Sequence, residues 1–156
     1  AEKLHPQNWK RIIRALEVYK LTGIPIWQWQ KNYNREIDIN FIQFGLEWDR
    51  NMLYININNR VERMIENGLI DEVKNILEMG YSFQLNSLNT VGYKEIISFL
   101  NNELTLEKAI ELIKRNTRRF AKRQLTWFKK DKRITWLKIN SFDEISFLSE
   151  KIIKLI

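Results

Sequence analysis

The segment NTRRFAKRQLTWFKK, residues 116–130, has the residue pattern of an amphipathic helix. In and just before it, cationic side chains recur every three to four positions, which is the spacing of one helical face, and apolar side chains recur on another face. The cations are Arg115, Arg118, Arg119, Lys122 and Lys129, and the apolar residues are Ile113, Phe120, Ala121, Leu125 and Phe128. Such a helix can pack against a core and hold a row of cations towards a polyphosphate. A solvated surface face is the alternative, and the aromatic residues among the cations favour nucleic acid.

Composition limits the class of protein further. The chain has 156 residues, an apolar fraction of 44% and a net charge of +7, so it can bury a core and favours an anionic partner. It has no cysteine and one histidine, His5, which we interpret as an ordinary surface residue. Disulfides and cysteine-ligated zinc are therefore excluded, and a transition-metal site is not expected. No segment approaches the ~20 apolar residues that cross a bilayer, and no signal peptide is recognisable, so we expect no membrane partner and a cytoplasmic location.

The spacing of apolar residues predicts a mostly helical α/β protein. Capping residues and glycines bound the expected helices at 8–22, 49–67, 71–79, 93–100, 105–130 and 141–156, with a short helix or loop at 26–36. Apolar runs predict strands at 37–46 and 134–139. Two strands so far apart in the sequence suggest a parallel sheet whose other strands lie outside this chain.

Two further segments carry residues suited to RNA. In the first predicted helix, Lys10, Arg11 and Arg14 lie close together and can contact phosphates, although an amphipathic surface helix is an equal alternative. In the segment 89–94, Asn-Thr-Val-Gly-Tyr-Lys, the glycine allows close backbone approach, the tyrosine offers a stacking face and the lysine adds charge. That combination suits an unstacked RNA base, and an ordinary glycine–tyrosine turn is the alternative.

Several short motifs follow one another along nearly the whole chain. They are Arg11-Ile-Ile-Arg14-Ala-Leu-Glu-Val-Tyr19, Thr22-Gly23-x-Pro25, Gly45-Leu46-x-x-Asp49-Arg50-x-x-Leu53-Tyr54, Arg60-Val61-x-x-Met64, Gly68-Leu69-x-Asp71-Glu72-Val73, Val91-Gly92-Tyr93-Lys94-Glu95-Ile96 and the basic segment 116–130. In this order they resemble the C-terminal half of the tRNA dimethylallyltransferase (tRNA isopentenyltransferase) family.

The resemblance implies a reaction, a fold and partners. The reaction is the transfer of a dimethylallyl group from dimethylallyl diphosphate to N6 of the adenosine beside the anticodon, with Mg²⁺ bound mainly through the diphosphate. The adenine is extruded from its loop to reach the donor. The fold is the C-terminal part of a P-loop-NTPase-like parallel-sheet core over residues 37–156, preceded by the end of a helical tRNA-binding insertion over residues 1–36. The partners are the tRNA anticodon stem-loop, the diphosphate donor and the N-terminal half of the same protein.

The resemblance also assigns residues by position. Those that match tRNA-contacting segments are Lys10, Arg11, Ile12, Ile13, Arg14, Asn89, Thr90, Val91, Gly92, Tyr93 and Lys94. Those that match the basic helix near the phosphate-binding end are Arg118, Arg119, Lys122 and Arg123, which we expect to support the diphosphate or the RNA backbone. Gln124, Thr126 and Trp127 match as well, and a packing or helix-positioning role suits them equally.

The chain departs from the family pattern in two places. None of its five glycines precedes a lysine, so the nucleotide-binding-like phosphate loop is absent, as is the early catalytic aspartate of the family. Asn56 stands where the family usually has an arginine thought to stabilise the leaving diphosphate. We therefore expect no catalytic residue in this chain, weak RNA binding and no transferase activity alone. A stand-alone basic RNA-binding module and a helical protein-interaction domain are the alternative functions.

Overall fold

A computed structural model of the chain describes residues 7–32 and 41–155. The surface position predicted for His5, residues 33–36 of the expected short helix or loop, and residues 37–40 of the first predicted strand lie outside the described residues. The chain divides into two compact units, Ala1–Phe41 and Ile42–Ile156.

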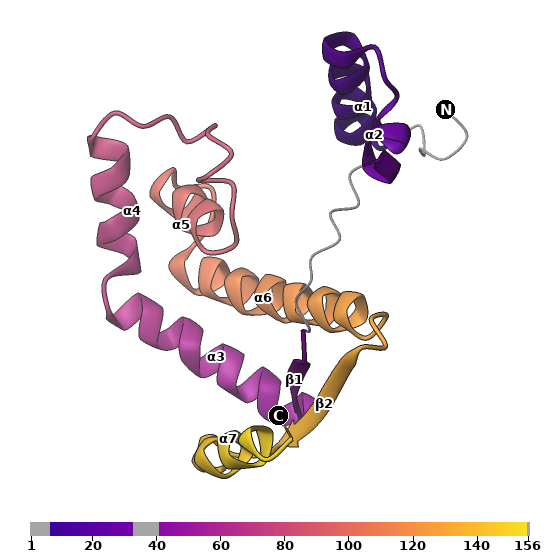
Figure 1. The fold of residues 1–156 in the computed structure, drawn as a ribbon. Helices are drawn as coiled ribbons and strands as arrows, with labels where there is room; N and C mark the ends of the chain where they lie inside the picture. Colours follow the sequence, from indigo (N-terminus) through magenta and orange to yellow (C-terminus); the bar gives the residue numbers. More distant parts are fainter. Residues whose placement is uncertain (1–6, 33–40, 156) are drawn as a thin grey trace. The chain divides into compact units, whose positions relative to one another are not determined.

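The first unit holds two helices, α1 (Trp9–Thr22) and α2 (Ile26–Asn32), which contact each other (Figure 1). Asn8 occupies the predicted N-cap position of α1, although its side chain makes no capping hydrogen bond. Gly23 ends α1 with a φ of 69°, a left-handed conformation that glycine adopts without steric cost, and its N–H donates to the Tyr19 carbonyl at 2.8 Å. No residue of α1 is buried.

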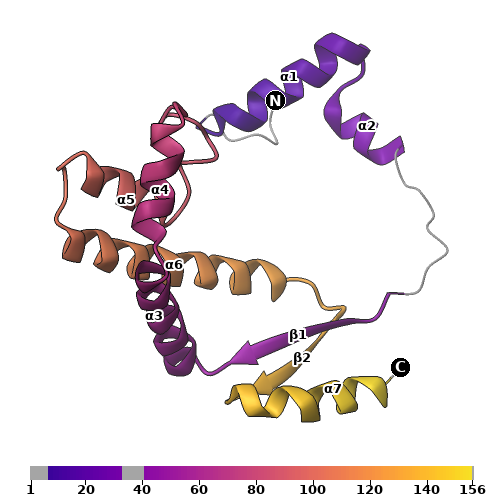
Figure 2. The ribbon, with the colours of Figure 1, turned by 90° about the vertical axis from the view of Figure 1, so that its left-hand side faces the viewer.

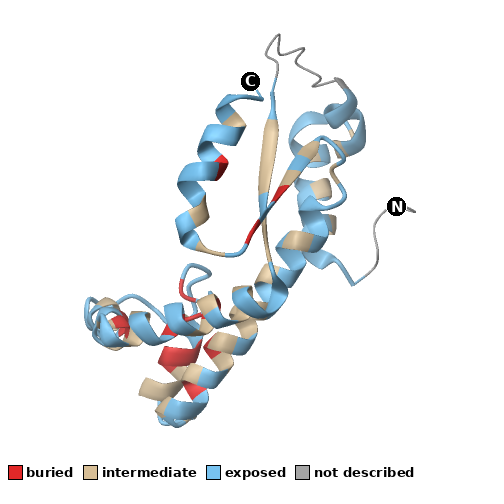
Figure 3. Cartoon of the chain, turned by 90° about the horizontal axis from the view of Figure 1, so that it is seen from below, coloured by how far each residue is buried: buried red, intermediate tan, exposed pale blue. Residues whose placement is uncertain are grey.

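The second unit contains a helical core built from α3 (Arg50–Glu66), α4 (Leu69–Glu78), α5 (Tyr93–Leu100) and α6 (Leu106–Phe128). The longest of these helices, α6, contacts both α3 and α5 (Figures 1 and 2). Their buried faces meet in one apolar cluster of Val61, Leu69, Val73, Leu88, Ile96, Ile97 and Ile113. Figure 3 colours the buried parts of the chain red. None of the helices that the structure describes is long and apolar enough to cross a membrane.

The same unit contains a two-stranded parallel sheet of β1 (Gln43–Trp48) and β2 (Ile134–Ile139). Their register pairs Gln43 with Ile134 and Trp48 with Ile139, so both strands end at the same edge. A 3₁₀ turn, η1 (Phe142–Glu144), leads into the last helix, α7 (Ile145–Ile153). A second apolar cluster, centred on Leu137, Ile139 and Leu148, packs α7 against one face of the sheet (Figure 2).

The helix boundaries confirm most of the expected elements. β2 and α5 have the predicted bounds, and Asp49 caps α3 by accepting hydrogen bonds from the backbone N–H groups of Asn51 and Met52 at 2.8 and 3.1 Å. Thr105 likewise caps α6 through the Lys108 N–H at 3.3 Å. The helices predicted to reach residues 130 and 156 end earlier, at Phe128 and Ile153.

The first strand overlaps the predicted range 37–46 but has different bounds within the described residues. In the described part of the chain, pairing begins at Gln43 and continues to Trp48. The alternating apolar pattern located a strand in this region, but its bounds depend on the residues of β2 that it pairs with, which lie far away in the sequence. The prediction that the two strands are parallel is confirmed.

Candidate functional site

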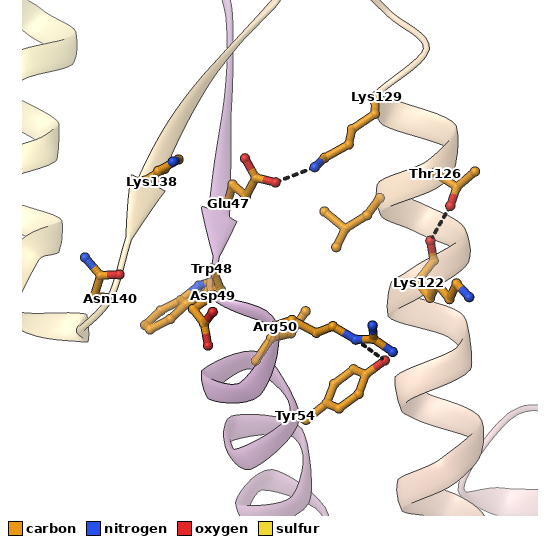
Figure 4. Close-up of a pocket in the computed structure, with 12 residues that line it drawn as sticks. Glu47, Trp48, Asp49, Arg50, Tyr54, Lys122, Thr126, Lys129, Lys138 and Asn140 are labelled. Carbon is orange, nitrogen blue, oxygen red and sulfur yellow. Dashed lines mark hydrogen bonds and ion pairs between the residues drawn. The ribbon is translucent and has the colours of Figure 1, made fainter.

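A cavity of about 730 Å³ lies at the carboxyl ends of β1 and β2 (Figure 4). Its walls come from both strand ends, from the first turns of α3 and from the last turns of α6. In open α/β sheets, ligands bind outside the carboxyl ends of parallel strands, because the loops there supply backbone and side-chain groups that converge on one point. The cavity therefore occupies the position where the fold offers a ligand site.

Cations outnumber carboxylates around this cavity. The cationic lining residues are Arg50, Lys122, Lys129 and Lys138, and the carboxylates are Glu47 and Asp49. Both carboxylates are already engaged, since Glu47 pairs with Lys129 and Asp49 caps α3 (Figure 4). The remaining positive charge suits an anionic ligand such as a diphosphate or an RNA phosphate.

Tyr54 orients Arg50 at one wall of the cavity. The guanidinium Nε of Arg50 donates to the Tyr54 hydroxyl at 3.3 Å, and its carbon lies 5.4 Å from the centre of the same ring. A cation held against an aromatic ring loses less conformational freedom when it binds an anion. On α6, the Thr126 hydroxyl donates to the Lys122 carbonyl at 2.9 Å, so this threonine bonds its own helix beside the cavity.

The four cations assigned to phosphate support by the resemblance face different surroundings. Lys122 lines the cavity. Arg118 is half-buried and turns towards α3, where its Nη1 donates to Asn58 Oδ1 at 2.6 Å. Arg123 places its guanidinium carbon 5.8 Å from the Phe120 ring centre, and Arg119 is exposed. The structure thus brings one of the four into the cavity.

Three cations of the cavity were missed as site residues by sequence reasoning. Arg50 and Lys129 stand inside the quoted motifs, and Lys138 lies in the predicted second strand. A signal existed for Lys138, because it lies in the last residues of the predicted second strand, where ligand-binding groups gather. Arg50 follows the observed end of β1, whereas the predicted strand ended at residue 46. Asn56, in contrast, lies half-buried on α3 and does not line the cavity.

The turn 89–94 lies at the start of α5, at a different place in the second unit. Gly92 has a φ of 105°, a region that residues with a Cβ rarely adopt, and nothing lies within 4 Å of the position where a Cβ would stand. Lys94 and Asn89 border a second cavity of about 260 Å³. Glycine is therefore favoured here by its backbone conformation, and the space where a Cβ would stand is empty.

Tyr93 has partners inside the protein. Its ring packs against the helical core, and its hydroxyl donates to the carboxylate of Glu72 on α4. This hydrogen bond raises the pKa of Tyr93 above its usual 10.0, with burial adding to the effect. Base stacking by this ring stays a prediction.

The first basic segment lies on α1, in the first unit. Lys10 places its Nζ 5.4 Å from the Trp9 ring centre, and Arg14 pairs with Glu17 at 3.3 Å. Arg11 is exposed, Ile12 is half-buried and Ile13 is exposed. Cations on this helix are thus available at the surface of their own unit.

A parallel strand pair with a cation-lined cavity at its carboxyl ends, next to a basic helix, defines the class of α/β protein in which the site suits an anionic ligand. Residues 1–131 match the family model described as IPP transferase, and the chain belongs to this family.

Relatives and solved structures agree with this assignment. The chain is 51% identical over 152 residues to the tRNA dimethylallyltransferase of Pelotomaculum thermopropionicum, covering 97% of this chain and 48% of the relative. It is 47% identical over 156 residues to that of Thermotoga maritima, covering 100% of this chain and 50% of the relative. The chain therefore spans about half the length of the curated relatives it matches.

The fold has solved counterparts. The full-length tRNA isopentenylpyrophosphate transferase from Bacillus halodurans matches 98% of this chain and 46% of its own, with 39% identity and a TM-score of 0.68. A eukaryotic dimethylallyltransferase acting on tRNA matches 96% of this chain and 40% of its own, with 25% identity and a TM-score of 0.70. These similarities confirm the mostly helical α/β fold.

Proposed function

We propose that this chain forms the C-terminal part of a tRNA dimethylallyltransferase. The substrates would be dimethylallyl diphosphate and the adenosine beside the anticodon of a tRNA. The proposal rests on family membership, and its main structural support is the cation-lined cavity at the carboxyl ends of β1 and β2. In this proposal the described sheet belongs to a larger P-loop-type parallel core, and α1 and α2 belong to a helical RNA-binding insertion.

The proposed reaction exchanges one bond to the allylic carbon for another. The bond from that carbon to the diphosphate oxygen breaks, a bond to adenine N6 forms, and N6 releases a proton. The products are the prenylated RNA and diphosphate. The role of this chain is to neutralise charge that builds up on the leaving diphosphate, which lowers the barrier because the charge develops in the transition state. The proton acceptor belongs to the half of the family pattern that these residues do not match.

Lys122 is the residue for which the proposed phosphate role has the most support. It was assigned to phosphate support from its motif, and it also lines the cavity. Arg50, Lys129 and Lys138 extend the same positive surface. We propose that Lys10–Arg14 and Asn89–Lys94 contact the RNA and that the cavity accepts the diphosphate or an RNA phosphate.

Magnesium enters this proposal with the diphosphate. The residues that the structure describes contain no group of three or more histidine, cysteine, aspartate or glutamate side chains that could hold a metal ion. Because Mg²⁺ commonly keeps several waters and binds through one or two carboxylates and substrate phosphates, the ion would be held mainly by the diphosphate. The function would place the protein where tRNA is processed, in the cytoplasm.

RNA binding by this chain tests the substrate assignment. An anticodon stem-loop RNA is compared with the same RNA carrying uridine in place of the target adenosine, by fluorescence anisotropy over a range of salt concentrations. We expect weak, salt-dependent binding with a preference for the adenosine and, for about four phosphate contacts, a logarithmic salt slope near −3. Lys122→Ala should reduce that slope by about 0.7, whereas Lys151→Ala on α7 should leave it unchanged.

Two outcomes would contradict the proposal. Equal affinity for the two RNAs would favour a stand-alone basic RNA-binding module, and a lack of salt-dependent binding would favour a protein-interaction domain. The expected lack of transferase activity is tested separately with dimethylallyl diphosphate and the stem-loop RNA. Turnover by this chain alone would show that it carries its own catalytic residues.

A further inference from the structure

Glu95 is the only charged residue that is buried in the described part of the chain, with 4% of its surface exposed. A buried carboxylate is unfavourable unless hydrogen bonds and positive charge compensate the loss of water. Glu95 lies in the first turn of α5, directly after the turn 89–94. Its position therefore calls for an explanation in terms of its partners.

Each carboxylate oxygen of Glu95 has a partner on a different segment. Oε2 accepts a hydrogen bond from the backbone N–H of Gly92 at 2.8 Å. Oε1 accepts one from Nδ2 of Asn116 on α6, also at 2.8 Å. The Lys94 ammonium lies 3.8 Å from Oε1, with 45% of its side chain exposed. One side chain thus links the turn, its exposed lysine and the basic helix.

The bond to Gly92 matters because of the backbone conformation there. With φ 105° and ψ −67°, Gly92 adopts a conformation that an unconstrained chain populates only in part. No atom lies within 4 Å of the position where its Cβ would stand, so contacts at that position do not impose this conformation. The hydrogen bond from Gly92 to Glu95 therefore selects this conformation of the turn, and the bond to Asn116 fixes the turn relative to α6.

We propose that Glu95 is a positioning residue for RNA recognition: it holds the turn 89–94 against α6 so that Lys94 and the cations of α6 meet one RNA together. This inference rests on the proposed function, because it assumes that the turn contacts RNA. Glu95 is enclosed and acts through Gly92, Lys94 and Asn116 instead of touching the RNA. A purely structural carboxylate would affect stability and leave the contribution of Lys94 to binding unchanged.

The test combines backbone hydrogen exchange with RNA affinity in the full 156-residue chain. The variants are Glu95→Ala, Glu95→Gln, Asn116→Ala and Lys94→Ala, with Glu150→Gln on α7 as a control that removes a carboxylate elsewhere. In Glu95→Ala we expect faster exchange of the Gly92 amide. We also expect about a tenfold loss of affinity for the anticodon stem-loop RNA, because binding must then order the turn without the charge-assisted hydrogen bond that held it. Glu95→Gln should restore affinity to within about twofold, since its amide can accept from Gly92 and donate to Asn116 Oδ1.

Coupling between residues separates positioning from a general loss of stability. Lys94→Ala should weaken binding in the wild-type background and have little further effect in Glu95→Ala, because the lysine is already misplaced there. Asn116→Ala should weaken RNA binding while exchange of the Gly92 amide stays slow, because the bond from Gly92 to Glu95 is kept. If Glu95→Ala does not fold, the Asn116→Ala variant tests the link between the turn and α6 in its place. The control should bind like the wild type.

The results that would overturn the inference are specific. Three results would each exclude a positioning role. The first is a double variant whose loss of RNA affinity equals the product of the losses in Glu95→Ala and Lys94→Ala, which would mean that the two residues act independently. The others are a Glu95→Gln variant that binds RNA as weakly as Glu95→Ala, and an exchange rate of the Gly92 amide that Glu95→Ala leaves unchanged. Failure of the wild-type chain to bind the RNA at all would instead contradict the proposed function, and the positioning role would fall with it. Gly92 exchange without RNA distinguishes these two failures.

Discussion

Arg118 on α6 donates from Nη1 to Asn58 Oδ1 on α3 at 2.6 Å, joining two helices whose bonded residues lie 60 positions apart. The same guanidinium carbon lies 5.8 Å from the Tyr54 ring centre. A second link between these helices is the ion pair of Lys114 and Glu62, at 2.6 Å. Part of the cationic face of α6 therefore bonds α3 and is not turned towards the cavity.

Because Asn58 accepts the hydrogen bond from Arg118, we expect its replacement to destabilise the fold. Asn58→Ala should lower the free energy of unfolding by about 1–2 kcal/mol, because it removes the acceptor of a half-buried charged group. Asn59→Ala is the matched control, since it makes the same change on an exposed position of the same helix and shares any gain in helix propensity. Urea unfolding followed by circular dichroism measures both. Equal effects of the two substitutions would mean that the Asn58–Arg118 bond contributes nothing.

Gly45 in β1 is required for close packing across the sheet. A Cβ at this position would lie 2.8 Å from Cε3 of Trp136 and 3.0 Å from Cγ2 of Ile134. Gly45→Ala should therefore lower the free energy of unfolding by about 1–3 kcal/mol through overpacking. In a Trp136→Leu background the same substitution should cost less, and a thermodynamic cycle of unfolding measurements gives this coupling. If the unfolding free energies of the two substitutions add, the contact with the Trp136 ring is not what makes an alanine at position 45 unfavourable.

The lowered pKa of the Asp131 carboxyl makes its contribution to folding stability depend on pH in the acid range. Hydrogen bonds from the Arg133 guanidinium, at 2.9 and 2.6 Å, and from its backbone N–H lower the pKa of the Asp131 carboxyl from 3.8 to about 2. A carboxyl whose pKa is lowered on folding stabilises the protein above pH 3.8, and this contribution disappears as the pH falls towards 2. The stability difference between the wild type and Asp131→Asn should therefore be constant above about pH 4 and shrink between pH 4 and 2.

Arg133→Gln provides the matched test of this mechanism. Without the guanidinium, the pKa of Asp131 should rise towards 3.8, which an NMR titration of the carboxyl carbon detects. Thermal unfolding between pH 2 and 5 gives the stability difference. A pKa that stays near 2 in Arg133→Gln would assign the shift to another cause.

Local chemistry explains which elements could be predicted. Asp49 and Thr105 each accept a hydrogen bond from the first turn of the helix that follows, and this bond needs only residues next to them in the sequence. The apolar run of β2 and the capping glycine before α5 are equally local, and both elements have the predicted bounds. The bounds of β1 differ from the predicted range because its first paired residue in the described part of the chain, Gln43, depends on Ile134 in β2.

The candidate site was predictable only in part, for a related reason. Motif position marked Lys122 as a phosphate residue, and the cavity includes it. The same motif could not show that Arg118 turns towards Asn58, because the partner lies on another helix. Arg50 and Lys138 join the cavity only once the two strands pair in parallel and place their ends together.

The sequence by itself determined the helical character of the chain, its family and its excess of positive charge, because periodicity, capping and motif order are properties of neighbouring residues. The tertiary structure decided which cations face the cavity and which are used for packing, and it brought Glu95 between Gly92 and Asn116. The reason is physical: a buried side chain takes its partners from whichever elements the core brings beside it, and those elements are distant in sequence.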